Sequence, residues 1–273
     1  MKIQLITLLL SFVCCNGKLK QVENNPVTQG IETRAASFDT LTKTIHVLVA
    51  LCDNTYQGIV PVPTLIGNGQ DPFNNLYWGC AYGIKTFFKK SAEWNLIQTE
   101  KIDSILLERL VFKHISKNVY LVADAYNGKY IKTCTRDFLL SCSGQKKATM
   151  LVNKTRIGIH GNASLITYIG HDGLMDFKLT EEFENTDGKI RDCIILACIS
   201  KNYYSPLIKS TKANPLIWTT GLMCPEAYTL HDALRGYVNS ESNEAIRCRA
   251  VRAYSSYQKC SEKSARGLLV TGW

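Results

Sequence analysis

The chain has 273 residues, of which 45% are apolar and 20% are charged, and its formal net charge is +9. This length suits one large domain or at most two small ones, and the apolar content excludes a wholly disordered chain. The basic residues are spread along the sequence and are not interleaved with aromatic residues. We therefore expect no nucleic-acid binding and only a mild preference for acidic surfaces.

The N-terminus has the pattern of a secretory signal. A single lysine precedes an apolar run over residues 5–15, and small residues end the run. The run is shorter than the roughly 20 apolar residues that a membrane-spanning helix needs. We therefore expect residues 1–17 to be cleaved, no membrane span, and a secreted, periplasmic or cell-envelope location. A lipid anchor through Cys14 or Cys15 is the alternative at this end.

Polar residues 18–40 predict a flexible leader, and residues 41–273 predict the folded domain. Nine of the 11 cysteines follow the signal. Outside the cytosol this number favours disulfides, and an odd number leaves at least one thiol unpaired. The alternative is that all nine are reduced and buried. The sequence has no CxxC pair and no Cys/His ligand spacing, so we expect neither a metal site nor another cofactor.

The expected domain begins with a buried strand. Residues 45–52 form a near-continuous apolar run, which is typical of a strand that is covered on both faces. Residues 57–75 contain Pro and Gly at short intervals and predict a long surface loop. Helix-like periodicity follows at residues 77–90 and again at residues 101–114.

The middle of the chain repeats the pattern of strand and helix. Residues 119–125 predict a second buried strand, and residues 133–142 predict a helix. Residues 149–152 and 156–160 have the pattern of a hairpin. Residues 165–169 predict a third buried strand, which ends at the sequence Gly-His-Asp-Gly.

The last part of the chain contains two more strands and then helices. The expected strands are residues 193–197 and 215–219, and the expected helices are residues 227–238 and 242–263. Strands that alternate with helices form βαβ units with right-handed crossovers. The sequence therefore predicts an α/β fold with a mostly parallel sheet between layers of helices.

The strongest chemical signal is a pair of side chains that follow two consecutive strands. His171 follows the third strand and Cys198 follows the fourth. Functional groups in open α/β sheets collect at the carboxyl ends of the strands, and neighbouring strands lie about 5 Å apart. A thiol becomes a strong nucleophile when an imidazole can take its proton. The sequence therefore predicts that His171 and Cys198 meet above a cleft.

These segments resemble the caspase-like cysteine peptidases, the group that includes caspases, clostripain and gingipains. That family has one apolar strand ending in His-Gly and a second ending in a small residue and Cys. The matching stretches here are LITYIGHDG at residues 165–173 and CIILACIS at residues 193–200. The resemblance implies a caspase-like three-layer α/β/α sandwich, a peptide or protein substrate, His171 as proton shuttle and Cys198 as nucleophile.

Other residues receive roles from the same comparison. The backbone amide of Asp172 or Gly173 would stabilise the oxyanion. Trp218 and Thr219, at the end of the next strand, would lie close to the substrate and line the cleft. Independently of the resemblance, Cys224 follows that strand and could face the same cleft, so it is the rival thiol.

The sequence departs from the caspase-like pattern in two ways. Asp172 replaces the glycine that usually follows the histidine. The interval between His171 and Cys198 is also shorter than the roughly 50 residues of caspases. The alternative function is therefore a secreted binding protein with a degenerate, non-catalytic fold of this kind, and a third is a thiol hydrolase that acts on other acyl compounds.

Four further residues have weaker signals. His231 could line the same cleft, and Asp176 could orient the imidazole of His171. His46 lies inside a buried strand and has the position of a structural residue, while Asp124 ends the second strand.

Overall fold

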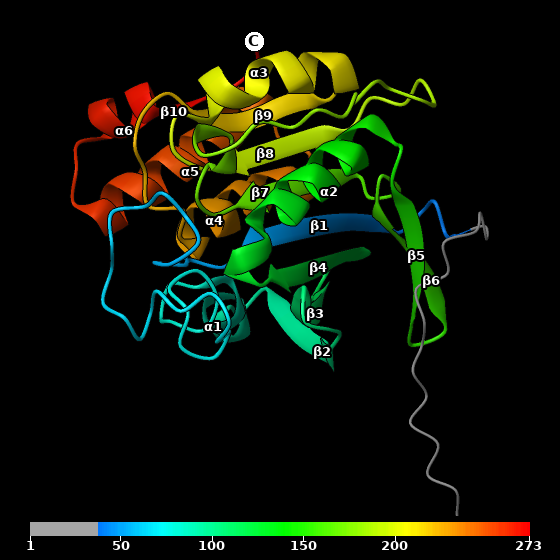
Figure 1. The fold of residues 1–273 in the computed structure, drawn as a ribbon. Coiled ribbons are helices and arrows are strands. Elements are labelled where there is room, and N and C mark those ends of the chain that lie inside the picture. Colours follow the sequence, from blue (N-terminus) through cyan, green and yellow to red (C-terminus); the bar gives the residue numbers. More distant parts are fainter. Residues whose placement is uncertain (1–37) are drawn as a thin grey trace, which may run out of the picture.

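The computed structural model describes residues 38–273. The expected signal, residues 1–17, and most of the expected leader lie outside the described residues. Figure 1 shows a single large sheet between helices, with the strand order β10-β9-β8-β7-β1-β4-β3-β2. The prediction of an α/β fold with a mostly parallel sheet is therefore confirmed.

The centre of the sheet is parallel and its edges are antiparallel. The parallel strands are β1 (Lys43–Ala50), β4 (Val119–Tyr126), β7 (Leu165–Ile169), β8 (Asp192–Leu196) and β9 (Asn214–Thr219). The antiparallel strands are β2 (Trp94–Lys101), β3 (Leu106–His114) and β10 (Leu269–Val270). A separate two-stranded sheet is the hairpin of β5 (Lys147–Val152) and β6 (Thr155–His160).

Helices cover both faces of the large sheet (Figure 1). One layer contains α2 (Ile131–Ser143) and α3 (Ser200–Thr211), whose buried side chains share a core with Leu48 and Ala50 of β1. The other layer contains α1 (Ile84–Lys90), α4 (Ala227–Val238) and α5 (Asn243–Gln258), and its core includes Val47 and Val49. The short helix α6 (Glu262–Leu268) packs Ala265 into this second core. Successive residues of β1 therefore enter opposite cores, as the pleat of a strand requires.

Most of the predicted elements are confirmed within one or two residues of their expected bounds. The central strands, α2, α4 and the β5–β6 hairpin are all present. The long loop after β1 is also present: residues 57–75 form neither helix nor strand. The sequence did not reveal α3, β2 or β10.

The predicted helix at residues 101–114 is wrong. This segment contains the end of β2 and all of β3. The buried β3 residue Arg109 lies directly opposite Asp124 of β4, and its guanidinium binds both carboxylate oxygens at 2.6 Å. A contact between residues 15 positions apart in the sequence does not appear in local periodicity, which is why the strand looked helical.

Two other helices are shorter than predicted. Residues 77–83 form turns, and α1 begins only at Ile84. A side chain at Gly83 would meet the backbone of Trp78 at 2.4 Å, so the chain folds back on itself before the helix starts. The expected helix at residues 242–263 ends at Gln258, because Lys259 takes a left-handed conformation and Ser261 caps a new helix, α6.

Two general properties concern residues 38–273 only. No helix among these residues is long and apolar enough to cross a membrane. The nine cysteines there are all free thiols, so the structure has the reduced arrangement rather than the disulfides that their number favoured.

Short 3-10 turns occur at η1 (Gly128–Tyr130) and η2 (Gly173–Met175).

Candidate active site

His171 and Cys198 lie at the same edge of the sheet. β7 and β8 are parallel neighbours, and Ile169 is paired with Leu196 near the end of both strands. His171 follows Ile169 by two positions, and Cys198 follows Leu196 by two positions. Both line one cavity of about 410 Å³. The register of two adjoining strands therefore brings an imidazole and a thiol to a common hollow.

A glycine makes the turn that carries His171 out of the strand. Gly170 has φ +145°, and a side chain there would meet the carbonyl oxygen of Ala50 at 2.7 Å. Only glycine suits both the conformation and the close approach to β1. The hydroxyl of Tyr168 donates to the carbonyl of His171 at 2.7 Å, which fixes the backbone after the turn.

Asp176 holds the ring of His171. The Nε2 atom lies 2.8 Å from Oδ2 of Asp176, and the same oxygen accepts the amide of Gly58 at 2.9 Å. An ionised carboxylate can only accept a hydrogen bond, so in the neutral ring Nε2 carries the hydrogen and Nδ1 is the basic nitrogen. Within residues 38–273 no hydrogen bond to Nδ1 is formed. This arrangement leaves a free base on an oriented ring.

Cys198 contacts a loop that follows β9. The amide of Met223 lies 3.4 Å from the Cys198 sulfur, and the thiol points to the carbonyl of Met223 at 3.6 Å. Burial raises the pKa of Cys198, the Met223 amide partly opposes this, and the charge of Asp172 adds to it. The resting side chain is therefore a neutral thiol, which needs a base before it can attack.

The backbone after Cys198 leads directly into helix α3. Ile199 has φ +50° and is the residue before the first turn, which begins at Ser200. The amide of Ile199 donates to Gly221 and that of Ser200 donates to Thr219. In the described part of the chain the Cys198 amide has no acceptor. It is therefore the donor best placed, beside the positive end of a helix, to bind a developing oxyanion.

The two residues expected to supply the oxyanion donor lie behind the cavity wall. Asp172 is fully buried, and its Oδ1 accepts the amide of Leu174 at 3.0 Å. Gly173 packs tightly against Phe177. Neither residue lines the cavity, although within residues 38–273 their own amides have no acceptor. The carboxyl group of Asp172 has an unpartnered Oδ2, and burial raises its pKa to about 7.

Trp218 and Thr219 do not line the cavity, which corrects the expectation for both. The indole of Trp218 is buried in the core beneath α3, and its N–H donates to Gly272 at 3.0 Å. The Thr219 hydroxyl donates to the carbonyl of Ala197. These residues still belong to the strand, where side chains alternate between the two cores rather than rise beyond its end. Thr219 instead stabilises the turn that contains Cys198, because its hydroxyl bonds the backbone on both sides of that turn, at Ala197 and Ser200.

Cys224 is an exposed thiol in the same cavity. Its amide lies 3.3 Å from the hydroxyl of Tyr254, and no imidazole contacts its sulfur among the described residues. The rival thiol therefore shares the cavity with His171 and Cys198, but it does not follow a strand that adjoins β7.

The remaining walls are mostly apolar and come from the loop after β1 and the loop after β9. Asn75 anchors the first loop, since its side chain bonds both the amide and the carbonyl of Cys52. This loop places Val62, Leu76 and Tyr77 in the wall. The sequence predicted the loop but not its role. The signal that could have revealed it is its position directly after a parallel strand.

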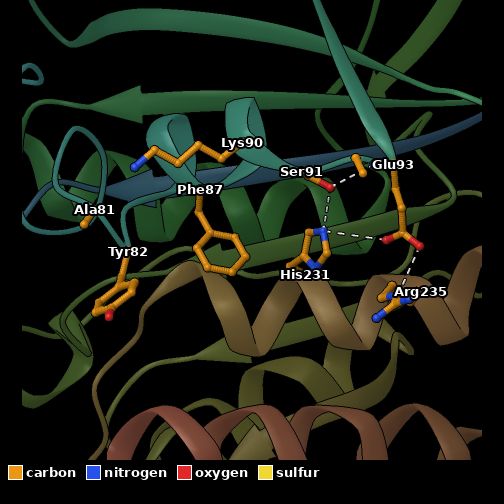
Figure 2. Close-up of a pocket in the computed structure, with 9 residues that line it drawn as sticks. Ala81, Tyr82, Phe87, Lys90, Ser91, Glu93, His231 and Arg235 are labelled. Atoms are coloured by element: carbon orange, nitrogen blue, oxygen red, sulfur yellow. Dashed lines mark hydrogen bonds and ion pairs between the residues drawn. The ribbon is translucent and has the colours of Figure 1, made fainter.

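His231 lies in a different hollow (Figure 2) and not in the cleft that its position after the loop of β9 suggested as a possibility. Its Nε2 lies 2.8 Å from the Ser91 hydroxyl, and its Nδ1 lies 3.1 Å from Asp232. Ser91 ends helix α1, where the helix dipole is negative, and the Glu93 carboxylate lies 3.7 Å from Nε2. Acyl transfer to Ser91 would develop an oxyanion next to these negative charges, which would disfavour it. We therefore do not assign acyl transfer to this hollow.

A second cluster, His46, Asp124 and His160, has three possible metal ligands close together. Arg109 already binds both oxygens of Asp124, and His46 Nε2 lies 2.9 Å from the same carboxylate. The other nitrogen of His46 accepts the amide of His160 at 3.0 Å. A cation would have to displace a buried guanidinium, so the donor set fits a structural network better than a metal ion.

Comparisons with protein-family models, with curated proteins and with solved structures give no match to this chain.

Proposed function

We propose that the protein is an exported cysteine peptidase of caspase-like fold, in which Cys198 attacks the substrate carbonyl and His171 transfers the proton. The observation that carries the proposal is the shared cavity of His171 and Cys198 at the ends of adjoining parallel strands. The three-layer arrangement and the two sequence motifs add support. The expected substrate is a peptide or protein, and the mechanism requires no metal or organic cofactor.

The first half of the reaction would follow from the hydrogen bonds of His171. Its Nδ1 takes the proton of Cys198 as the sulfur bonds to the carbonyl carbon, and Asp176 stabilises the imidazolium through Nε2. The Cys198 amide stabilises the oxyanion. The carbon–nitrogen bond then breaks, and the leaving amine takes the proton from Nδ1.

The second half restores the enzyme. Nδ1 takes a proton from water, and the hydroxide oxygen bonds to the thioester carbon. The carbon–sulfur bond breaks, the carboxyl product leaves, and the sulfur regains its proton from His171. Each atom of water is thus accounted for in the acid and amine products.

Labelling with a peptidyl acyloxymethyl ketone tests the proposal. Mass spectrometry should find the label on Cys198, and Cys198→Ala should abolish both labelling and turnover. His171→Ala should lower kcat/KM by about 10²- to 10⁴-fold. Cys224→Ser is the matched thiol variant, and it separates the two cysteines of the cavity. Label on Cys224, or labelling that His171→Ala leaves unchanged, would contradict the assignment.

A second candidate is a binding protein that uses the same cavity without catalysis. The raised pKa of Cys198 favours it, because a catalytic thiol more often has a lowered pKa. In that case peptides should bind to the protein and be recovered intact, and Cys198→Ala should bind them equally well.

A further inference from the structure

The cavity has a rim of large apolar side chains that face solvent. Val60 is 87% exposed, Leu222 is 73% exposed and Met175 is 40% exposed. They come from three separate segments: the loop after β1, the loop after β9 and the turn η2. Isolated exposed apolar residues are ordinary, but their convergence round one hollow marks a binding site for apolar groups.

The wall between the rim and the thiol is also apolar. Val62, Leu76, Tyr77 and Met223 line the cavity as well, and the backbone of Met223 contacts the sulfur. Tyr77 and Met223 are both buried. A side chain that enters from the rim towards Cys198 would therefore exchange water for hydrocarbon along its length.

The cavity offers little to a charged side chain. The described lining residues include no lysine or arginine. Their one carboxyl side chain, Glu226, already accepts the hydroxyl of Tyr228 at 2.9 Å and the amide of Gln258 at 3.3 Å. Burial also raises the pKa of Glu226. An acidic side chain would find no lysine or arginine here, and a basic one would find only the Glu226 carboxyl group, whose charged form burial disfavours.

From the apolar rim, the apolar wall and the lack of lysine and arginine among the described lining residues, we propose that the cavity binds a bulky aliphatic or aromatic side chain of a peptide. In the enzyme this side chain belongs to the residue whose carbonyl Cys198 attacks. The cleavage part of this statement rests on the proposed function, but the binding preference does not.

A series of peptide substrates tests the cleavage preference. The peptides differ only at the residue before the scissile bond, which is Phe, Leu, Ala, Arg or Asp. Burial of a Phe or Leu side chain should raise kcat/KM about 10- to 100-fold over Ala, and Arg and Asp should be no better than Ala. Preferred cleavage after Arg or Asp would overturn the inference and leave the peptidase proposal standing.

A rim variant with a matched control locates the effect. Leu222→Ser should lower the preference for Phe over Ala about three- to tenfold. Ile190→Ser is the control, because Ile190 is an apolar loop residue with 75% exposure that does not line the cavity. Its preference should match that of the unmodified protein. Equal effects of the two substitutions would overturn the inference.

Binding to Cys198→Ala separates this inference from the proposed function. Calorimetry with the same Phe, Ala, Arg and Asp peptides needs no catalysis, and the Phe peptide should bind about 10- to 100-fold more tightly than the Ala peptide. If no peptide is cleaved but this order of affinity holds, the peptidase proposal fails and the inference stands. If Arg or Asp peptides bind best, or if all four bind equally, the inference fails.

Discussion

Two histidine–aspartate pairs of this protein have almost the same contact and very different surroundings. In the first, His46 Nε2 lies 2.9 Å from Oδ2 of Asp124, and in the second, His171 Nε2 lies 2.8 Å from Oδ2 of Asp176. The first pair is fully buried inside the sheet. In the second pair, His171 lines the cavity and 30% of the Asp176 side chain is exposed.

The neighbours of the two pairs decide what each can do. Arg109 and the amide of His160 complete the hydrogen bonds of the first pair. The ion pair with Arg109 and the contact with His46 hold the pKa of Asp124 well below its ordinary value, against the effect of burial. In the described part of the chain, His171 Nδ1 has no such neighbour. A pair whose hydrogen bonds are all made can only stabilise the fold, whereas a pair with one free nitrogen that shares a cavity with a thiol has a nitrogen that can take up a proton.

The largest expected effect comes from removing the carboxylate of the first pair. Asp124→Ala leaves Arg109 as an unpaired buried charge, and we expect a loss of about 3–5 kcal/mol in the free energy of unfolding. Urea denaturation measures this loss. Replacing both partners, as in Asp124→Leu with Arg109→Met, should cost less because no buried charge remains unpaired. A double variant that is no more stable than Asp124→Ala would show that the network does not act as described.

Replacing the aspartate of the second pair should affect catalysis and leave stability almost unchanged. Asp176→Asn keeps an acceptor for Nε2 but removes the charge that stabilises the imidazolium. We expect kcat to fall about 10- to 100-fold with little change in KM. Glu182→Gln is the control, because Glu182 is an exposed acid of the same crossover. If kcat survives in Asp176→Asn, Asp176 does not orient a catalytic base.

The position of the candidate site could be predicted because it depends on strands that can be recognised from the sequence. Strands buried on both faces appear as continuous apolar runs, and the expected bounds of β7 and β8 agree with the structure within one residue. Consecutive parallel strands are often neighbours in a sheet, and β7 and β8 are. His171 and Cys198 could be placed at one sheet edge for these reasons.

The parts that could not be predicted depend on contacts between distant residues. The apolar residues of β3 fit the period of a helix as well as that of a strand. The contact between Arg109 and Asp124 that identifies the strand cannot be inferred from the neighbouring sequence. His231 follows the loop after β9, which suggested the cleft, but α4 carries it towards Ser91. Val60 lies in a loop with no periodicity, so nothing local indicated that it forms a cavity rim.

A third aspartate, Asp172, has neither a cation nor a second side-chain hydrogen bond among residues 38–273. Burial raises its pKa to about 7 from the ordinary value of 3.8. The folded protein therefore keeps a proton that the unfolded chain loses above about pH 4. The stability that this proton contributes is complete below pH 4 and is lost as the pH rises through about 7.

Asp172→Asn should remove this dependence, and its effect on stability should be smaller than that of Asp124→Ala. At pH 8 we expect the variant to be more stable than the unmodified protein by about 1–3 kcal/mol, and at pH 4 the two should be nearly equal. Urea denaturation at both pH values measures the difference. Asp187→Asn is the contrasting variant, because hydrogen bonds from Arg191 hold the pKa of Asp187 below its ordinary value. It should lose stability at pH 8, so the two substitutions should shift stability in opposite directions. A common direction would mean that the Asp172 carboxyl group is hydrated in solution and that the wall behind His171 is not closed to water.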